Sequence, residues 1–219
     1  MKRQSGPFMT IIFACAAALA ALVSVVPAQA QTRPIRLVAL GDSLSAGYNL
    51  PQEAVFPVVL EKALKAKGHN VEVANAGVSG DTSSAGLDRL DWSVPDGTDG
   101  VILELGANDM LRGLDPAGTR RNLEAIVERL KSRNIPVMLA GMYASRNLGH
   151  SYTEQFDSIY PYIAKKYDLV LYPFFLDGVA GERSLNLPDG MHPTAKGVEV
   201  IVERILPSVE SFLARLAQR

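Results

Sequence analysis

The stretch Ile35–Leu40, IRLVAL, is apolar at every position except Arg36, and Gly41 follows it directly. A short, nearly continuous apolar run predicts a strand that is buried on both faces, as in a parallel sheet. The glycine predicts a turn at the carboxyl end of that strand. We therefore expect the fold to be built on a buried parallel sheet.

Apolar runs and longer amphipathic stretches continue to alternate along the chain. Further strands are expected at Val71–Ala74, Val101–Leu105, Ile135–Ala140 and Leu169–Leu171. Helices are expected at Val55–Lys67, in a short stretch after Thr82, and at Asn122–Ser132, Tyr152–Tyr167 and Ala195–Leu216. Pro207 is expected to kink or divide the last helix. The alternation predicts a single α/β domain, a three-layer α/β/α sandwich around a mostly parallel five-stranded sheet.

The composition excludes several classes of protein. The 219 residues carry 22 Lys and Arg against 23 Asp and Glu, a net charge of −1, so no basic field favours nucleic acid. A hydrophobic share of 47% is too high for a disordered chain. The single cysteine, Cys15, cannot form a disulfide within the chain. Three scattered histidines offer no metal-ligating cluster, so no metal or other cofactor is expected.

The first 30 residues have the pattern of an export signal. Lys2 and Arg3 precede an apolar run over residues 8–26, which Pro27 and the small-x-small sequence Ala28-Gln29-Ala30 follow. We expect a signal peptide at 1–30, cleavage near Ala30, and a mature domain at 31–219 that is periplasmic or secreted. Cleavage would leave 189 residues with a net charge of −3, no cysteine and no stable membrane span. Alternatively, the run is kept as an anchor, since about 20 apolar residues span a bilayer.

Polar segments follow the strands, where sites of open α/β sheets lie. They are Gly41–Tyr48 after the first strand, Asn75–Thr82 after the second, Gly106–Asp109 after the third and Asp189–Pro193 after the fifth. Because the carboxyl ends of parallel strands meet at one edge, these segments are expected to form one site.

A serine, a histidine and an aspartate in these segments fit nucleophilic catalysis. Asp189 precedes His192 by three residues, so its carboxylate can turn back onto the imidazole and fix the tautomer. The other ring nitrogen is then free to take a proton from Ser43. His69 stands at a helix end and His150 in a polar loop, which leaves His192 as the best base. The structural alternatives are an N-cap role for Ser43 and a surface turn at Asp189 and His192.

Together the four segments resemble the GDSL, or SGNH, hydrolase superfamily, whose motifs occur here in the family's order across the mature chain. Gly41-Asp42-Ser43-Leu44-Ser45 resembles the first motif, with Ser43 in the nucleophile position. Gly77 matches the second motif, Asn108 the third, and Asp189 with His192 the last. A narrower similarity, to the exported thioesterase I/lysophospholipase L1/arylesterase group, is carried by GDSLSAGY, ELGANDMLRG and YPFFL.

The resemblance implies a flavodoxin-like SGNH hydrolase fold and a catalytic triad of Ser43, His192 and Asp189. It also implies an oxyanion hole made by the backbone N–H groups of Ser43 and Gly77 and by the Asn108 side-chain amide. A glycine at 77 suits this role because the missing Cβ would let the backbone approach the substrate.

The implied activity is that of an exported serine esterase that hydrolyses carboxylic esters and thioesters through an acyl-enzyme. The expected partner is a small-molecule ester or thioester, and a monomer is expected. Met110–Leu114 is expected to shape the acyl groove; the alternative is an ordinary surface loop with Leu111 in the core. Two other functions remain open: a carbohydrate or xenobiotic deacetylase on the same scaffold, and a non-catalytic periplasmic binding protein.

Three acidic residues near these motifs have other expected roles. Asp42 and Asp109 are expected to support the neighbouring backbone turns. Glu104 lies in a strand that should be buried, so it should be paired or protonated, and the sequence does not name its partner.

Overall fold

The computed structural model describes Met1 and residues 33–218. The expected signal peptide (apart from Met1), its cleavage position near Ala30, and Cys15 lie outside the described residues. The folded unit begins at Arg33 and includes all four polar segments. Within residues 33–218, no helix has the length and apolar character needed to cross a membrane.

Five parallel strands form one sheet, which confirms the expected sheet. The strands are β1 (Ile35–Gly41), β2 (Val71–Gly77), β3 (Gly100–Glu104), β4 (Val137–Ala140) and β5 (Val170–Tyr172). Their spatial order is β2-β1-β3-β4-β5, and each neighbouring pair is parallel.

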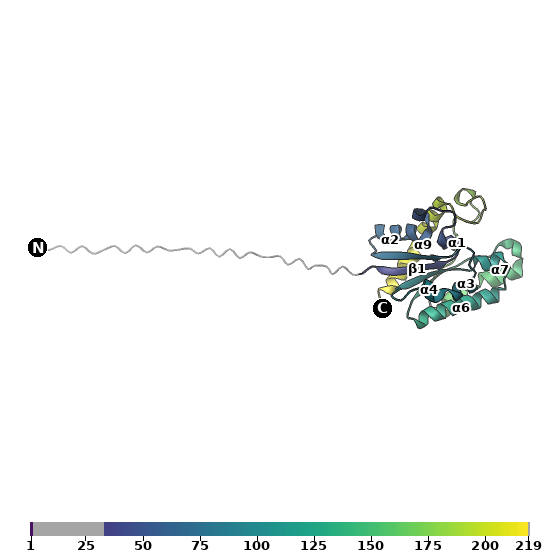
Figure 1. Cartoon of the computed structure of the whole chain (residues 1–219), viewed down its shortest axis with the longest axis horizontal. Helices are drawn as coiled ribbons and strands as arrows, with labels where there is room; N and C mark the ends of the chain where they lie inside the picture. Colours follow the sequence, from purple (N-terminus) through teal and green to yellow (C-terminus); the bar gives the residue numbers. More distant parts are fainter. Residues whose placement is uncertain (2–32, 219) are drawn as a thin grey trace. The chain divides into compact units, whose positions relative to one another are not determined.

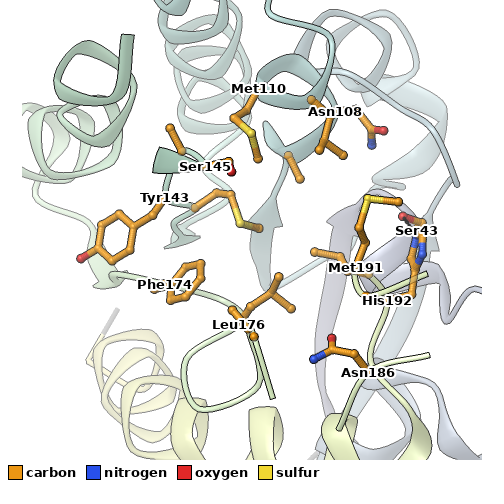
Figure 2. A pocket seen from close by; sticks show the side chains of 18 of the residues that line it. Ser43, Asn108, Met110, Tyr143, Ser145, Phe174, Leu176, Asn186, Met191 and His192 are labelled. Carbon is orange, nitrogen blue, oxygen red and sulfur yellow. Dashed lines mark hydrogen bonds between the residues drawn. The ribbon is translucent and has the colours of Figure 1, made fainter. Parts of the chain in front are cut away.

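The strand order reverses beside β1, because the chain adds β2 on one side of it and then β3 on the other. The register aligns Gly41 with Gly77 of β2 and with Glu104 of β3, so these three strand ends lie level. Open α/β sheets bind their ligands at such a switch point, beyond the carboxyl ends of the strands. The pocket in Figure 2 lies at this edge.

Helices cover both faces of the sheet and complete the expected three-layer sandwich (Figure 1). One face carries α2 (Phe56–Ala66) and α9 (Ala195–Leu216), which pack against each other. The other face carries α3 (Ser83–Asp88), α4 (Leu90–Ser93), α6 (Pro116–Ser132) and α8 (Ile159–Tyr167). The described chain also forms α1 (Ser43–Ala46), α5 (Ala107–Leu111), α7 (His150–Asp157) and 3₁₀ turns at Gln52–Ala54, Arg146–Leu148 and Arg183–Leu185.

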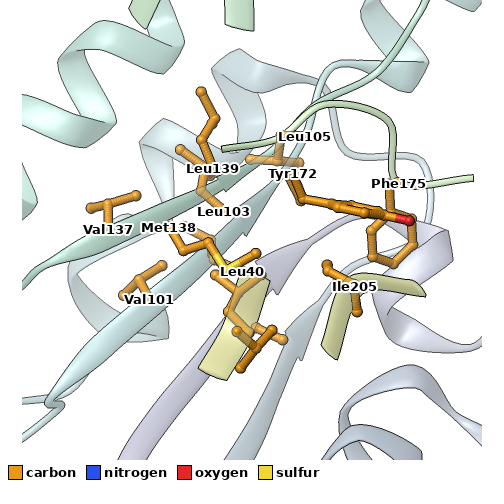
Figure 3. Close-up of a cluster of buried hydrophobic side chains, with 14 of the residues drawn as sticks. Leu40, Val101, Leu103, Leu105, Val137, Met138, Leu139, Tyr172, Phe175 and Ile205 are labelled. Atoms are coloured by element: carbon orange, nitrogen blue, oxygen red, sulfur yellow. The ribbon is translucent and has the colours of Figure 1, made fainter. Parts of the chain in front are cut away.

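Apolar side chains from both sides of the sheet make the core. Leu40, Leu103 and Leu139 of three neighbouring strands are fully buried, as is Ile205 of α9. Figure 3 shows these side chains gathered with Phe175. Full burial of one such side chain contributes about 1.5–3 kcal/mol, so the core holds the strand ends in a fixed register.

Two helices differ from the sequence-based expectation at their boundaries. α6 begins at Pro116 rather than Asn122, because Asp115 caps it by accepting from the Ala117 N–H at 3.0 Å. The expected helix over 152–167 is instead two helices, α7 and α8, that meet at Ser158. Pro161 has no N–H to donate to the residue four before it, which accounts for the break.

α9 is one helix through Pro207, so the expected division is wrong. Ile205 and Val209 are buried on either side of the proline, and their packing holds both halves to the core. Pro207 and Glu203, whose carbonyl loses its helical partner, are both exposed residues. Water can therefore satisfy that carbonyl.

Candidate active site

Ser43 is the first residue of α1, immediately beyond β1. The N-cap is Asp42, whose Oδ1 accepts from the Leu44 N–H at 3.0 Å. Gly47 ends this short helix in the left-handed region at φ 82°, which favours glycine. Because Asp42 is the N-cap, the alternative in which Ser43 caps the helix is wrong. The Ser43 hydroxyl makes a different contact.

The Ser43 hydroxyl meets His192, 149 residues away in sequence, with 2.9 Å between Oγ and Nε2. The imidazole Nδ1 lies 2.8 Å from Asp189 Oδ2. With Nδ1 protonated, the ring donates to the carboxylate and its Nε2 accepts from the serine. The Tyr48 ring also packs over the imidazole, with 4.4 Å between the ring centroids. The structure thus brings these three sequence-predicted residues into one hydrogen-bonded line.

Asp189 is held by its own local turn. Its Oδ1 accepts from the backbone N–H groups of Met191 at 2.9 Å and His192 at 3.0 Å. Three hydrogen bonds lower the pKa of Asp189 to about 2. In order of size, they come from the His192 N–H, the Met191 N–H and the His192 side chain. Asp189 is therefore a carboxylate at neutral pH and can orient the imidazole.

Asn108 lies in α5, just beyond β3, and its side chain points to the same edge. Its Nδ2 donates to Asp42 Oδ2 at 3.1 Å and to the Asp81 carbonyl at 3.0 Å. Gly106, at φ 121°, makes the turn from β3 into α5. A Cβ there would lie 2.2 Å from Tyr160 Oη, so the turn requires glycine.

Gly77 has a different environment from the one expected. Its N–H donates to Asn75 Oδ1 at 2.9 Å, so this donor is already occupied. A Cβ at 77 would lie 2.3 Å from the backbone nitrogen of Ala46. The backbone of α1 therefore approaches residue 77 closely enough to require a glycine there.

The N–H of Gly80, in the turn after β2, differs from that of Gly77, which is occupied by Asn75. Among residues 33–218, the Gly80 N–H meets no acceptor, and its carbonyl accepts from Arg112 at 2.7 Å. It directly precedes Asp81, whose carbonyl contacts the Asn108 amide. Gly80 is not among the sequence-predicted site residues, although it stands beside Asp81 in the same motif.

Two buried carboxyl groups, Asp42 and Glu104, lie next to α1. Glu104 Oε2 accepts from Ser45 Oγ at 2.8 Å and lies 3.4 Å from the Asp42 nitrogen, while Oε1 meets no partner within the described chain. Burial raises the pKa of Asp42 to about 6. Burial, followed by the negative charge of Asp42, raises the pKa of Glu104 well above its usual range. The partner that the sequence did not name for Glu104 is Ser45.

The Asp109 carboxylate bonds to the start of α3 and to α6 rather than to its own turn. It accepts from the Ser83 N–H at 2.7 Å, from Ser83 Oγ at 2.5 Å and from Thr119 Oγ1 at 3.1 Å. These bonds tie α5 to α3 and α6. The other two histidines lie outside the site: His69 contacts Glu210 at 3.1 Å, and the His150 side chain is 91% exposed.

A cavity of about 540 Å³ extends from Ser43, Asn108 and His192 (Figure 2). Its wall is mostly apolar and includes Met110, Leu111, Met142, Tyr143, Phe174, Leu176 and Met191. Tyr143 and Phe174 stack at the far end, with 4.9 Å between their ring centroids. Met110 and Leu111 line the cavity, and Leu111 is 55% exposed, so the alternative that places Leu111 in the core is wrong.

Known proteins resemble this chain in sequence and in fold. A model of the GDSL-like Lipase/Acylhydrolase family matches residues 39–200. An arylesterase of Vibrio mimicus is 38% identical over 179 residues, which are 81% of this chain and 90% of that protein. Thioesterase 1/protease 1/lysophospholipase L1 of Escherichia coli strain K12 is 39% identical over 158 residues, 72% of this chain and 74% of that protein. The crystal structure of AlinE4, a SGNH-hydrolase family esterase, is 48% identical, with a TM-score of 0.70 and coverage of 83% of this chain and 97% of that one.

Proposed function

The chain belongs to the GDSL-like lipase/acylhydrolase family and is an ester-hydrolysing enzyme, and from that premise we propose that Ser43, His192 and Asp189 carry the reaction. One observation supports this above all. The hydrogen-bonded line from Asp189 through His192 to Ser43 ends at the mouth of an apolar cavity. A nucleophile, its base and an acyl-binding wall are thus adjacent.

In the first half of the reaction, Ser43 Oγ attacks the carbonyl carbon and His192 Nε2 takes the hydroxyl proton. Asp189 stabilises the imidazolium and keeps its own charge. The tetrahedral intermediate collapses when His192 gives that proton to the leaving alcohol or thiol, which leaves an acyl group on Ser43. Water then attacks the acyl-enzyme, His192 again takes the proton, and the carboxylic acid is released.

The oxyanion needs donors on the side of the carbonyl opposite the histidine. We assign them to the Ser43 N–H, which meets no acceptor in the described chain, and to the Asn108 amide. One hydrogen of the Asn108 amide donates to the neutral Asp81 carbonyl in the free enzyme, and it donates to the oxyanion instead during the reaction. For the second backbone donor, the sequence pointed to Gly77; because that N–H is bonded to Asn75, we propose the Gly80 N–H instead.

The cavity wall favours an apolar acyl or aryl group over a sugar. Carboxylic esters and thioesters both present a carbonyl that Ser43 can attack, and the names of the relatives include both activities. Each methylene buried along the wall contributes about 0.8 kcal/mol, or a factor of about four in rate or affinity. We therefore expect substrates with medium-length acyl chains to be preferred to acetyl esters.

A fluorophosphonate probe tests the nucleophile. One probe should attach per chain, at Ser43, and Ser43→Ala should abolish labelling and lower kcat by about 10⁶-fold. Ser145→Ala is the matched control, since Ser145 is a second serine in the cavity lining and its loss should leave labelling intact. An unlabelled wild-type protein, or a Ser43→Ala variant that keeps a few per cent of activity, would refute the assignment.

A chain-length series of p-nitrophenyl esters and matching thioesters tests the substrate class. The specificity constant kcat/KM should rise from acetyl to medium chains by about fourfold per methylene until the cavity is filled. A strict preference for acetate would support the deacetylase alternative instead.

We also propose that residues 1–30 are an export signal that is removed near Ala30, which places the enzyme in the periplasm or outside the cell. The basic start, the apolar run and the Ala28-Gln29-Ala30 sequence support this. After expression of the full chain, the N-terminus of the exported protein should be Gln31. Ala30→Phe should block processing, whereas a full-length protein retained in the membrane fraction would indicate an anchor.

A further inference from the structure

Asp42 links α1, the helix that begins with Ser43, to the Asn108 amide. Its side chain is completely buried, and each carboxyl oxygen meets a donor from a different segment. Oδ1 accepts from the Leu44 N–H at 3.0 Å, and Oδ2 accepts from Asn108 Nδ2 at 3.1 Å. We propose that Asp42 is a positioning residue for the reaction, which fixes the Asn108 amide relative to Ser43.

A carboxylate suits this role because it accepts hydrogen bonds and donates none. The Asp81 carbonyl, the second group that the Asn108 amide contacts, is also only an acceptor. If the amide turned over, its oxygen would face two acceptors, so only the NH₂ end can point this way. Asp42 therefore ensures that Asn108 presents a hydrogen to the oxyanion.

Burial raises the pKa of Asp42, the hydrogen bonds from the Leu44 N–H and the Asn108 amide lower it, and the neighbouring charges have smaller effects. Glu104 of β3 is a buried neighbour whose Oε2 lies 3.4 Å from the Asp42 nitrogen. On the β2 side, Asp81 is paired with Arg89 at 2.5 Å, and Arg89 also donates to the Gly41 carbonyl at 2.9 Å. A positive charge on His192, in the last loop, would lower the pKa of Asp42.

Of the two buried carboxyl groups, Asp42 is the better placed to be ionised, because each of its oxygens accepts an N–H bond, whereas Glu104 Oε1 meets no partner within the described chain. Burial raises the pKa of Asp42 to about 6, and burial, followed by the charge of Asp42, raises the pKa of Glu104 well above its usual range. At neutral pH, Asp42 is therefore a carboxylate, and its charge favours the protonated form of Glu104. Ionisation of Glu104 would place a second charge next to the first, which the buried site disfavours.

Substitution by asparagine breaks this arrangement with little change in shape. An amide has one acceptor oxygen, so it can serve the Leu44 N–H or Asn108 Nδ2, but not both. Asp42→Asn should therefore lower kcat by about 10- to 100-fold, less than the loss of the Asn108 donor itself, and leave KM within about twofold.

A double-mutant cycle with Asn108→Ala separates positioning from general damage to the fold. Asn108→Ala alone should lower kcat by about 10²–10³-fold. If Asp42 acts through Asn108, adding Asp42→Asn to Asn108→Ala should change kcat by no more than about twofold. A purely structural Asp42 would instead multiply the two losses.

Two further variants keep the test decisive. Asp42→Ser retains an N-cap oxygen for Leu44 but is too short to reach Asn108, so it should show the same coupling if Asp42→Asn fails to fold. Asp115→Asn is the matched control, an aspartate N-cap on α6 with its Oδ1 3.0 Å from the Ala117 nitrogen. It should leave kcat unchanged.

The role of Asp42 rests on the proposed function, and different results would overturn each of the two. Loss of labelling in wild-type protein, or activity retained by Ser43→Ala, would overturn the proposed function. With those results intact, multiplied losses in the cycle, or kcat within twofold of wild type for both Asp42 variants, would overturn the role of Asp42 alone.

Discussion

At the scale of single residues, the site depends on which donor each carboxylate oxygen meets. Asp189 Oδ1 accepts hydrogen bonds from two backbone N–H groups of its own turn, and Oδ2 contacts the imidazole Nδ1. One side chain thus shapes the loop and fixes the tautomer of His192. Asp42 divides its oxygens in the same way between a helix cap and the Asn108 amide.

Asp189→Asn should separate these two tasks. The amide oxygen can still accept from the Met191 and His192 N–H groups, but the amide nitrogen faces Nδ1 and favours the tautomer with its proton on Nε2. We expect kcat to fall by about 10³–10⁴-fold with little change in melting temperature. Steady-state kinetics and thermal unfolding measure the two effects.

Asp189→Ala is the companion variant, because it removes the turn bonds as well. It should lower both kcat and the melting temperature. If Asp189→Asn kept more than about a tenth of the wild-type kcat, the orienting role of Asp189 would be wrong.

At the scale of elements, α1 is pressed between the ends of β1 and β2. Gly77 lets the α1 backbone approach β2, since a Cβ there would lie 2.3 Å from the Ala46 nitrogen and 2.8 Å from the Asp42 carbonyl oxygen. Both are backbone atoms, which cannot turn away as a flexible side chain can. The position of Ser43 therefore depends on a glycine in the neighbouring strand.

Gly77→Ala should displace α1 and lower stability by about 2 kcal/mol or more, with a matching loss of kcat. Gly77→Ala keeps the backbone N–H, so a loss of stability or of kcat would come from altered packing and not from a missing donor. Gly118→Ala in α6 is the control, where the nearest atom to a new Cβ is 3.7 Å away. It should stabilise the protein by about 0.5–1 kcal/mol in denaturant unfolding. An unchanged Gly77→Ala variant would contradict the packing role.

At the scale of the whole molecule, the buried carboxyl groups couple stability to pH. In the folded protein, the pKa values of Asp42 and Glu104 are raised above those of the unfolded chain. Protonated carboxyls then favour the folded state, so stability is greatest below the unfolded pKa values and falls as pH rises through them. For Asp42, this loss occurs between about pH 4 and pH 6.

Glu104→Gln should remove the part of this pH dependence that Glu104 contributes. The free energy of unfolding of the variant, relative to wild type, should increase with pH above about 4.5, by at most about 1.4 kcal/mol per pH unit. Urea unfolding at pH 5 and pH 8 measures this difference. A constant difference between the two proteins would show that Glu104 ionises normally.

The sequence by itself predicted the sheet, its five strands and the three polar segments that supply Ser43, Asn108, Asp189 and His192. It could do so because these features are local. Strands and helices follow from apolar spacing, and Asp189 lies three residues from the histidine that it contacts. The GDSL-type motifs pointed to Ser43 and Asn108 as site residues, since each motif occupies one loop.

The contacts between those loops follow from the three-dimensional packing of the chain. The level ends of β1, β2 and β3 bring Glu104 to Ser45, 59 residues away, and place Gly77 against α1. Asp42 reaches Asn108 across 66 residues for the same reason. These contacts depend on strand register and on the packing of side chains between elements, and no pattern within a single segment of the chain encodes either.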